Sequence, residues 1–205
     1  MFIFKQNDLK KNRFAAIDEF LTLNLLSKDV FLAGGAIRSL FDSEEPKDYD
    51  LFFRTTEAVP KVRETLKAAG YDLIFACPQE KLFSYQHTTP LDGPDGGFKN
   101  IKVQLILENT GSPETIIDDF DFNACRAAMD DTFVYIPLEF VKDIITKTLT
   151  LHKITFPVAT IKRFAKYREK GFNINKAVRD MVQQLLSMGK DGVMFNEEEL
   201  RIYID

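Results

Sequence analysis

Residues 31–53, FLAGGAIRSLFDSEEPKDYDLFF, decide the predicted fold of this chain. An apolar run ends at the glycine pair Gly34 and Gly35, and the residues that follow have the composition of a short helix. Asp48 and Asp50 then open a second run that is otherwise apolar and aromatic, which is typical of a strand. The stretch therefore predicts a strand, a tight turn, a helix and a second strand that begins with two acids.

Each part of this pattern has a use in phosphate chemistry. Glycines at a strand-to-helix turn let backbone N–H groups approach a phosphate, and the helix dipole favours that anion. Arg38, on the predicted helix, would add a charge-assisted contact. Asp48 and Asp50 lie two positions apart in a strand, so their side chains share one face and can hold Mg²⁺ or Mn²⁺. Two such ions activate an attacking hydroxyl and stabilise a leaving pyrophosphate.

Each of these signals also has a plainer interpretation. A glycine pair is usually only a turn, and an Asp-x-Asp sequence is often a solvated strand end. Their order, their spacing and the arginine between them favour the functional interpretation. A chance pattern in an unrelated α/β domain is the alternative.

The bulk composition is that of a globular protein with one ordinary domain and an appendage. Among the 205 residues, 45% are hydrophobic and 28% are charged. No apolar run approaches the ~20 residues needed to cross a bilayer, and no export signal is visible, so we expect a cytoplasmic protein without a membrane partner. The net charge of −4 argues against a protein that coats nucleic acid. Cys77 and Cys125 stand in apolar stretches, which predicts buried free thiols.

The rest of the chain predicts an α+β fold built on a mixed β-sheet. Strands and helices alternate in the first part, whereas only helices follow later, and we predict a head domain over residues 1–152 and a small helical module over residues 153–205. The predicted helices cover residues 12–26, 57–69, 121–129, 138–146, 159–170 and 176–188. The further predicted strands cover residues 71–76, 82–88, 100–107 and 132–136.

The first motif resembles that of tRNA nucleotidyltransferases (CCA-adding enzymes) and bacterial poly(A) polymerases, which belong to the DNA polymerase β superfamily. Their head domains carry GG-x-V-R-D followed by D-x-D, and this chain reads GG-A-I-R-S. DFDFNACRAA, residues 119–128, resembles their RRDFTINA block, and IKRFAKYREKGF, residues 161–172, is similar to one of their helices. The resemblance implies a nucleotidyltransferase head with Mg²⁺ or Mn²⁺, a nucleoside triphosphate donor and RNA or tRNA as a candidate acceptor.

The resemblance also assigns residues to roles. Asp48 and Asp50 would be the catalytic metal ligands. Nucleotide binding would fall to a larger set, with two glycines and an arginine on the triphosphate and the others on the nucleotide or acceptor side: Gly34, Gly35, Arg38, Asp119, Asn123, Arg126 and Arg163. Tyr167 and Phe172, in the basic helical segment, are candidates for base stacking.

The sequence departs from the family pattern at several places. Ser39 replaces the acid that follows the arginine, and Ile117 and Asp118 replace the arginine pair of the second block. Gln104 stands in IKVQLIL, where the superfamily commonly has a third carboxylate. An amide offers a carbonyl oxygen but cannot act as a carboxylate base.

These departures leave alternatives open. The protein works with two acids, or Glu108, Asp118 or Asp119 substitutes for the third, or catalysis has been lost. Two functions follow: a nucleotidyltransferase that acts on an RNA 3′ end, a protein or a small molecule, and a catalytically inactive module that binds nucleotide, RNA or a partner protein. The sequence indicates no oligomeric state.

Overall fold

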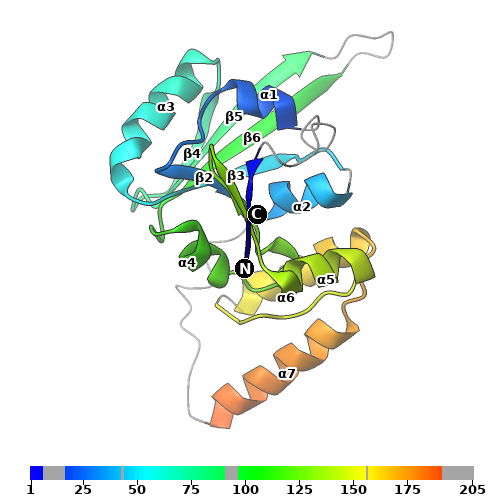
Figure 1. Cartoon of the computed structure of the whole chain (residues 1–205). Helices are drawn as coiled ribbons and strands as arrows, with labels where there is room; N and C mark the ends of the chain where they lie inside the picture. Colours follow the sequence, from blue (N-terminus) through cyan, green and yellow to red (C-terminus); the bar gives the residue numbers. More distant parts are fainter. Residues whose placement is uncertain (7–16, 43, 91–96, 156, 191–205) are drawn as a thin grey trace. The chain divides into compact units, whose positions relative to one another are not determined.

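The structure is a computed structural model that describes residues 1–6, 17–42, 44–90, 97–155 and 157–190 (Figure 1). The internal contacts of the chain divide it into two compact units. The first consists of residues 1–118 and 127–136, and the second of residues 119–126 and 137–205. The domain boundary after residue 152 stays a prediction.

The first unit is built on an eight-stranded mixed sheet in the order β1-β8-β7-β2-β3-β6-β5-β4. Of these neighbours, β3 and β6 run parallel and the other pairs are antiparallel. The α+β class with a mixed sheet is therefore confirmed. The strands are β1 (Phe2–Lys5), β2 (Val30–Ala33), β3 (Asp48–Phe53), β4 (Asp72–Ala76), β5 (Leu82–Pro90), β6 (Phe98–Ile106), β7 (Ala128–Met129) and β8 (Phe133–Ile136).

The helices of the first unit are α1 (Asp18–Thr22), α2 (Gly35–Asp42), α3 (Val59–Ala68) and α4 (Pro113–Asp118). Two of them cover one face of the sheet. Phe20 of α1 stacks on Tyr49 of β3 with ring centroids 4.2 Å apart, and Arg63 Nε of α3 donates to Tyr85 Oη of β5 at 3.0 Å. Successive residues of a strand point to opposite faces of the sheet. The residues directly before and after Tyr49 in β3 therefore point to the face that α1 and α3 do not cover.

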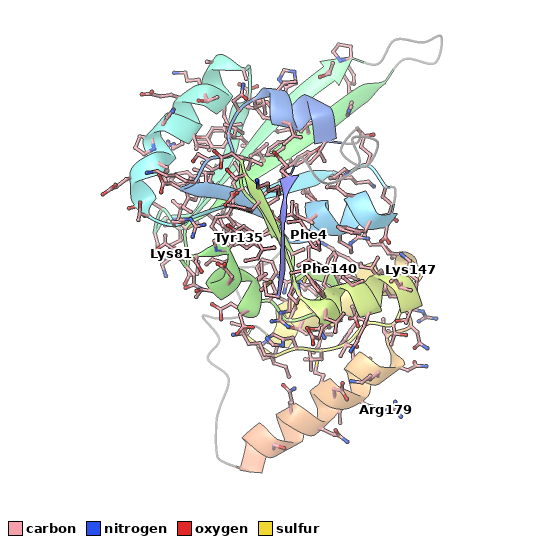
Figure 2. The ribbon with its side chains drawn as sticks, viewed as in Figure 1. Phe4, Lys81, Tyr135, Phe140, Lys147 and Arg179 are labelled. Atoms are coloured by element: carbon pink, nitrogen blue, oxygen red, sulfur yellow. The ribbon has the colours of Figure 1, made fainter. Side chains whose placement is uncertain are left out.

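The central strands supply the core of this unit. All four residues of β2 are buried, and Leu51, Phe53 and Leu105 are completely inaccessible to solvent. Each such side chain contributes about 1.5–3 kcal/mol relative to an exposed one. At the edge, β1 pairs with β8, and Figure 2 labels Phe4 and Tyr135 on these two strands. The buried centre fixes β2 and β3 side by side.

The second unit contains α5 (Leu138–Thr146), α6 (Pro157–Glu169) and α7 (Asn175–Lys190), together with a 3₁₀ turn at Asn123–Cys125. Phe122 is at its centre, with ring centroids 5.3 Å from Phe164 and from Tyr167. Tyr167 packs in turn against Phe172, and these two rings are only 8% and 3% exposed. Core packing occupies both rings, so these two candidates for base stacking are core residues of this unit.

Most predicted elements are confirmed with shifts of one to a few residues at their ends, and the strand over 48–53 and the helix over 138–146 match exactly in extent. Of the helix predicted over 12–26, residues 12–16 lie outside the described residues, and the described part contains α1. The edge strand β1 and the helix α4 were not predicted. Cys77 and Cys125 are free, as predicted, but both are half-buried.

The helix predicted over residues 121–129 is wrong. The segment forms only the 3₁₀ turn and then β7. Its backbone is paired elsewhere, since Phe122 bridges to Leu151 and the Asn123 N–H donates to Thr150 O at 3.0 Å. Tertiary pairing thus overrides the helical spacing of apolar residues.

Candidate functional site

The glycine turn follows directly from the end of β2. Gly34 has a φ of 83°, a conformation that a side chain disfavours, and its N–H donates to Ala127 O at 2.9 Å. Gly35 is exposed, and a Cβ built on it would meet nothing within 4 Å. The turn therefore requires a glycine at Gly34, whereas Gly35 leaves open space above the start of α2.

The two aspartates of β3 lie beside this turn. β2 and β3 are paired so that Ala33 is opposite Asp50. Asp48 is exposed and Asp50 half-buried, whereas Tyr49 between them is 3% exposed and faces the covered side of the sheet. Asp48 and Asp50 thus share the opposite face and form a carboxylate dyad next to the glycine turn.

The neighbouring strand brings Gln104 to the dyad. In the parallel pair of β3 and β6, Asp50 is opposite Gln104 and Asp48 is opposite Lys102. Gln104 Nε2 donates to Ser84 Oγ at 3.1 Å. This hydrogen bond uses the amide nitrogen of Gln104 and not its carbonyl oxygen. A neutral side chain therefore occupies the place next to Asp50 where the resemblance implies a third acid.

The candidate substitutes for that acid are not strand neighbours of Asp50. Glu108 lies beyond the end of β6 and accepts from Lys81 Nζ at 2.9 Å (Lys81 is labelled in Figure 2). Asp118 ends α4, and Asp119 belongs to the second unit. Within the described residues, no three His, Cys, Asp or Glu side chains form a metal-binding group.

The available donors nevertheless suit a hard cation. Mg²⁺ prefers oxygen ligands and is commonly bound through one or two carboxylates, with water and substrate phosphates completing its shell. Asp48 and Asp50 supply two carboxylates on one face, and Gln104 adds an amide oxygen beside them. This donor set fits Mg²⁺ or Mn²⁺ bound together with a nucleoside triphosphate.

Arg38 is held within its own segment. It is 3% exposed, and its guanidinium donates to Asp42 at 2.7 Å, to Glu44 at 3.3 Å and to Ser39 Oγ at 3.1 Å. The two carboxylates compensate its charge. A phosphate would therefore have to compete with these acids for Arg38.

The residues predicted from the second block lie in the second unit. Arg126 and Asn123 are both buried, and Arg126 Nη1 donates to Asn123 Oδ1 at 3.0 Å. The same Nη1 lies 3.2 Å from His152 Nδ1. Asp119 is paired with Lys153. These side chains form one hydrogen-bonded cluster with a separate ion pair beside it.

Asp121 is a buried residue that the sequence interpretation missed. It is 4% exposed, and its Oδ2 accepts from Thr160 Oγ1 at 3.0 Å and from Arg163 Nη1 at 2.6 Å. Burial by itself lowers the pKa of Arg163, but the charge and hydrogen bond of Asp121 outweigh it and raise that pKa. Burial, with the charge of Asp121, also raises the pKa of Cys125 to about 12. The sequence gives one signal that Asp121 is a buried acceptor, namely that this acid stands between two phenylalanines.

The predicted site residues thus fall into two groups. The first unit brings together the glycine turn, the dyad and Arg38. The second unit contains the other four candidates: Asp119, Asn123, Arg126 and Arg163.

This sheet, with an Asp-x-Asp strand beside a glycine turn, defines a nucleotidyltransferase-like head fold. Solved structures agree. A CCA-adding enzyme in complex with CTP is similar with a TM-score of 0.65 and 14% identity, over 93% of this chain and 48% of that enzyme. The Thermotoga maritima CCA-adding enzyme complexed with tRNA is similar with a TM-score of 0.61 and 15% identity, over 92% of this chain and 47% of that enzyme. The chain spans about half the length of these enzymes, and at this identity the likeness shows the fold.

The chain belongs to the Gabija anti-defense 2 family, whose sequence model matches residues 7–147. A curated relative, Gabija anti-defense 2 of Bacillus phage SPbetaL7, is 28% identical over 171 residues. The match covers 82% of this chain but 40% of the relative, so the chain spans less than half of that protein's length. Among the described residues, no helix combines the length and apolarity needed to cross a membrane.

Proposed function

We propose that the chain is a metal-dependent nucleotidyltransferase that moves a nucleoside monophosphate from a nucleoside triphosphate to a hydroxyl acceptor. The observation that carries the proposal is the dyad of Asp48 and Asp50 beside the turn at Gly34, with Ala33 opposite Asp50. The similar CCA-adding enzymes were solved with CTP and with ATP, which supports a nucleotide donor.

The residues of the first unit have distinct roles in this proposal. Asp48 and Asp50 would hold Mg²⁺ or Mn²⁺, and Gln104, opposite Asp50 on the neighbouring strand, would offer its amide oxygen. A metal ion held by Asp48 and Asp50 would activate the acceptor hydroxyl and neutralise charge on the leaving group. The backbone at Gly35 offers open space for the triphosphate, and Arg38 reaches a phosphate when it exchanges one of its carboxylate partners.

The reaction is a displacement at the α-phosphorus. The acceptor oxygen forms a bond to that phosphorus, the bond from the phosphorus to the oxygen bridging to the β-phosphate breaks, and pyrophosphate leaves with the electron pair. The acceptor proton passes to water. The charge that builds on the phosphoryl oxygens is what the site must stabilise.

The second unit would supply the nucleotide or acceptor side. Asp119, Asn123, Arg126 and Arg163 are the proposed contacts there. Asp121 accepts from Thr160 Oγ1 and from Arg163 Nη1 and so orients the half-exposed guanidinium of Arg163, whose further N–H groups are the proposed contacts to a phosphate of the nucleotide or of an RNA acceptor.

A second candidate is a catalytically inactive nucleotidyltransferase-like module that binds nucleotide, RNA or a partner protein. Two observations favour it. The neutral Gln104 stands next to Asp50, and Arg38 is neutralised by Asp42 and Glu44.

The transfer assay separates these candidates. The protein is incubated with Mg²⁺ and each α-labelled nucleoside triphosphate, with total tRNA or cell lysate as acceptor. Transfer by the native chain that is lost in the Asp48→Asn/Asp50→Asn variant supports the enzyme. Asp131→Asn, an exposed acid of the same unit, is the matched control and should retain transfer. Nucleotide binding without any transfer supports the inactive module.

Family membership further suggests a role against Gabija defence, since the phage relative is named for anti-defense. We propose that this role uses the dyad. Expression of the native chain in a Gabija-carrying host should raise the plating efficiency of a phage that Gabija restricts, whereas the Asp48→Asn/Asp50→Asn variant should not. Equal protection by both proteins would place the role outside the dyad.

A further inference from the structure

The sheet face that carries the dyad continues over the β5–β6 hairpin. Strand alternation and pairing place alternate residues of these strands on the face of Asp48 and Asp50, because Gln104 is opposite Asp50 and Ser84 is opposite Gln104. The hairpin runs on beyond the start of β3 (Figure 1). We call this surface the dyad face, and its hairpin residues are Ser84, Gln86, Thr88 and Pro90 of β5 and Phe98, Asn100, Lys102 and Gln104 of β6.

The middle of the dyad face is a ladder of neutral hydrogen-bonding side chains. Thr88 Oγ1 donates to Asn100 Oδ1 at 2.8 Å, and Gln86 Nε2 lies 3.4 Å from the same oxygen. Gln104 Nε2 donates to Ser84 Oγ at 3.1 Å, one step nearer the dyad. These contacts hold amides and hydroxyls in fixed positions from the dyad outward, and such groups match the N–H and C=O groups of a polypeptide.

Two exposed aromatic rings flank the ladder. Phe98 is 69% exposed at the far end of the hairpin, on the same face as Asn100. Phe75 of β4 is 50% exposed and is opposite Ser84, which places it on this face as well. Exposed aromatic residues beside neutral polar groups are typical of protein-binding surfaces.

The charge of the dyad face argues against a nucleic acid. Among its described residues, Lys102 is opposed by three acids: Asp48, Asp50 and Asp72, the last being opposite Gln86. In the proposed function a metal ion compensates Asp48 and Asp50, and Asp72 balances Lys102, so this face lacks the basic surface that nucleic-acid binding requires. A neutral or basic polypeptide needs no such surface.

We propose that the dyad face binds a polypeptide acceptor, a neutral or basic segment that presents a Ser, Thr or Tyr hydroxyl to Asp48 and Asp50. This inference rests on the proposed nucleotidyltransferase function and names its substrate class. The side-chain oxygen forms the bond to the α-phosphorus, pyrophosphate leaves, and the hydroxyl proton passes to water. The product is a protein with a nucleoside monophosphate joined to it as a phosphodiester.

The test offers two kinds of acceptor to the full chain with Mg²⁺ and the α-labelled nucleoside triphosphates. One is a library of synthetic peptides with a central Ser, Thr or Tyr and flanking Lys or neutral residues, and the other is total tRNA. We expect labelled peptides, with the nucleoside monophosphate located on a hydroxyl by mass spectrometry. The Phe98→Ser/Asn100→Ala variant should lower peptide labelling about tenfold or more. Thr89→Ala, on the opposite face of the same hairpin, should stay within about twofold.

The outcomes separate this inference from the function on which it rests. Transfer to tRNA without transfer to any peptide would keep the nucleotidyltransferase and overturn the polypeptide acceptor. Peptide labelling that Phe98→Ser/Asn100→Ala leaves unchanged would overturn the dyad face as its binding surface. Failure to transfer to either acceptor, in a protein that circular dichroism shows to be folded, would overturn both proposals.

Discussion

At the scale of single residues, a few strand and turn positions define the candidate site. Gly34 is constrained by its backbone, and Asp48 and Asp50 are placed by the alternation of β3. Gln104 is placed by the pairing of β3 with β6. Each of these positions has a neighbour that serves as its control.

The glycine turn gives the first prediction. Gly34→Ala should lower the free energy of unfolding by about 1–2 kcal/mol, because its φ of 83° is unfavourable for a residue with a Cβ. Gly35→Ala should change it by less than about 0.5 kcal/mol, since the added methyl meets nothing within 4 Å. Urea unfolding of both variants checks this. Equal losses would mean that backbone conformation does not distinguish the two glycines.

The amide beside Asp50 gives the second prediction. Gln104→Glu supplies a third carboxylate at the dyad, so we expect half-maximal nucleotide binding at a lower Mg²⁺ concentration. Gln86→Glu adds the same charge to the same face one strand farther out and should shift that concentration less. Titration of Mg²⁺ at fixed nucleotide measures both. A larger shift in the control would show that Gln104 does not lie at the metal.

At the scale of helices and strands, the sequence predicts those elements whose signals are local. β3 and α5 follow from composition and spacing alone, and the dyad follows from the period of a strand. The segment after Asp119 does not, because Asp121 is held by Thr160 and Arg163, which lie about 40 residues later in the chain. The ion pairs of Arg38 with Asp42 and Glu44 could not be predicted from the sequence either, because acids close to an arginine in sequence are also typical of a solvated surface.

The link between the Asp121 segment and α6 gives the third prediction. Asp121→Ala should lower the free energy of unfolding by about 1–3 kcal/mol, because it removes the buried carboxylate that accepts from the hydroxyl of Thr160 and from the guanidinium of Arg163. Asp119→Ala, which removes an exposed ion pair two residues away, should cost less than about 1 kcal/mol. Chemical denaturation compares them, and a smaller loss for Asp121→Ala would contradict the assigned contacts.

The end of α5 gives a pH prediction. Asp143 is 4% exposed, and burial raises its pKa from 3.8 to about 6 despite the hydrogen bond from the Thr150 N–H. The folded state therefore binds the proton more tightly than the unfolded state, so this residue makes stability fall as pH rises from about 4 to about 6. Asp143→Asn should remove that fall and should be more stable than the native chain at pH 8.

The control for the pH prediction is Glu139→Gln, an exposed acid on the same helix. It should leave the difference in stability between pH 4 and pH 8 unchanged. Urea unfolding at the two pH values measures both variants. If Asp143→Asn kept the full native pH dependence, the titrating group would be another residue.

At the scale of the whole molecule, the chain joins two compact units that hold different parts of the candidate chemistry. The first contains the dyad and the glycine turn, and the second contains Arg163 with the residues that hold it. The chain also covers less than half of its phage relative and about half of the CCA-adding enzymes. The head fold was predicted best from the sequence, because its motif is one contiguous stretch. The contacts of the candidate residues within each unit could not be predicted in this way, because they join segments that are distant in the sequence.

The release of pyrophosphate from each nucleoside triphosphate, in the presence of Mg²⁺ and the peptide and tRNA acceptors, tests the catalytic role of Asp48 and Asp50 most directly. We predict that the native chain releases pyrophosphate from at least one of them and that Asp48→Asn/Asp50→Asn does not, while Asp131→Asn does. Release that is equal in the native chain and in the dyad variant, or no release from a protein that binds nucleotide, would contradict the assignment of Asp48 and Asp50 as a catalytic pair.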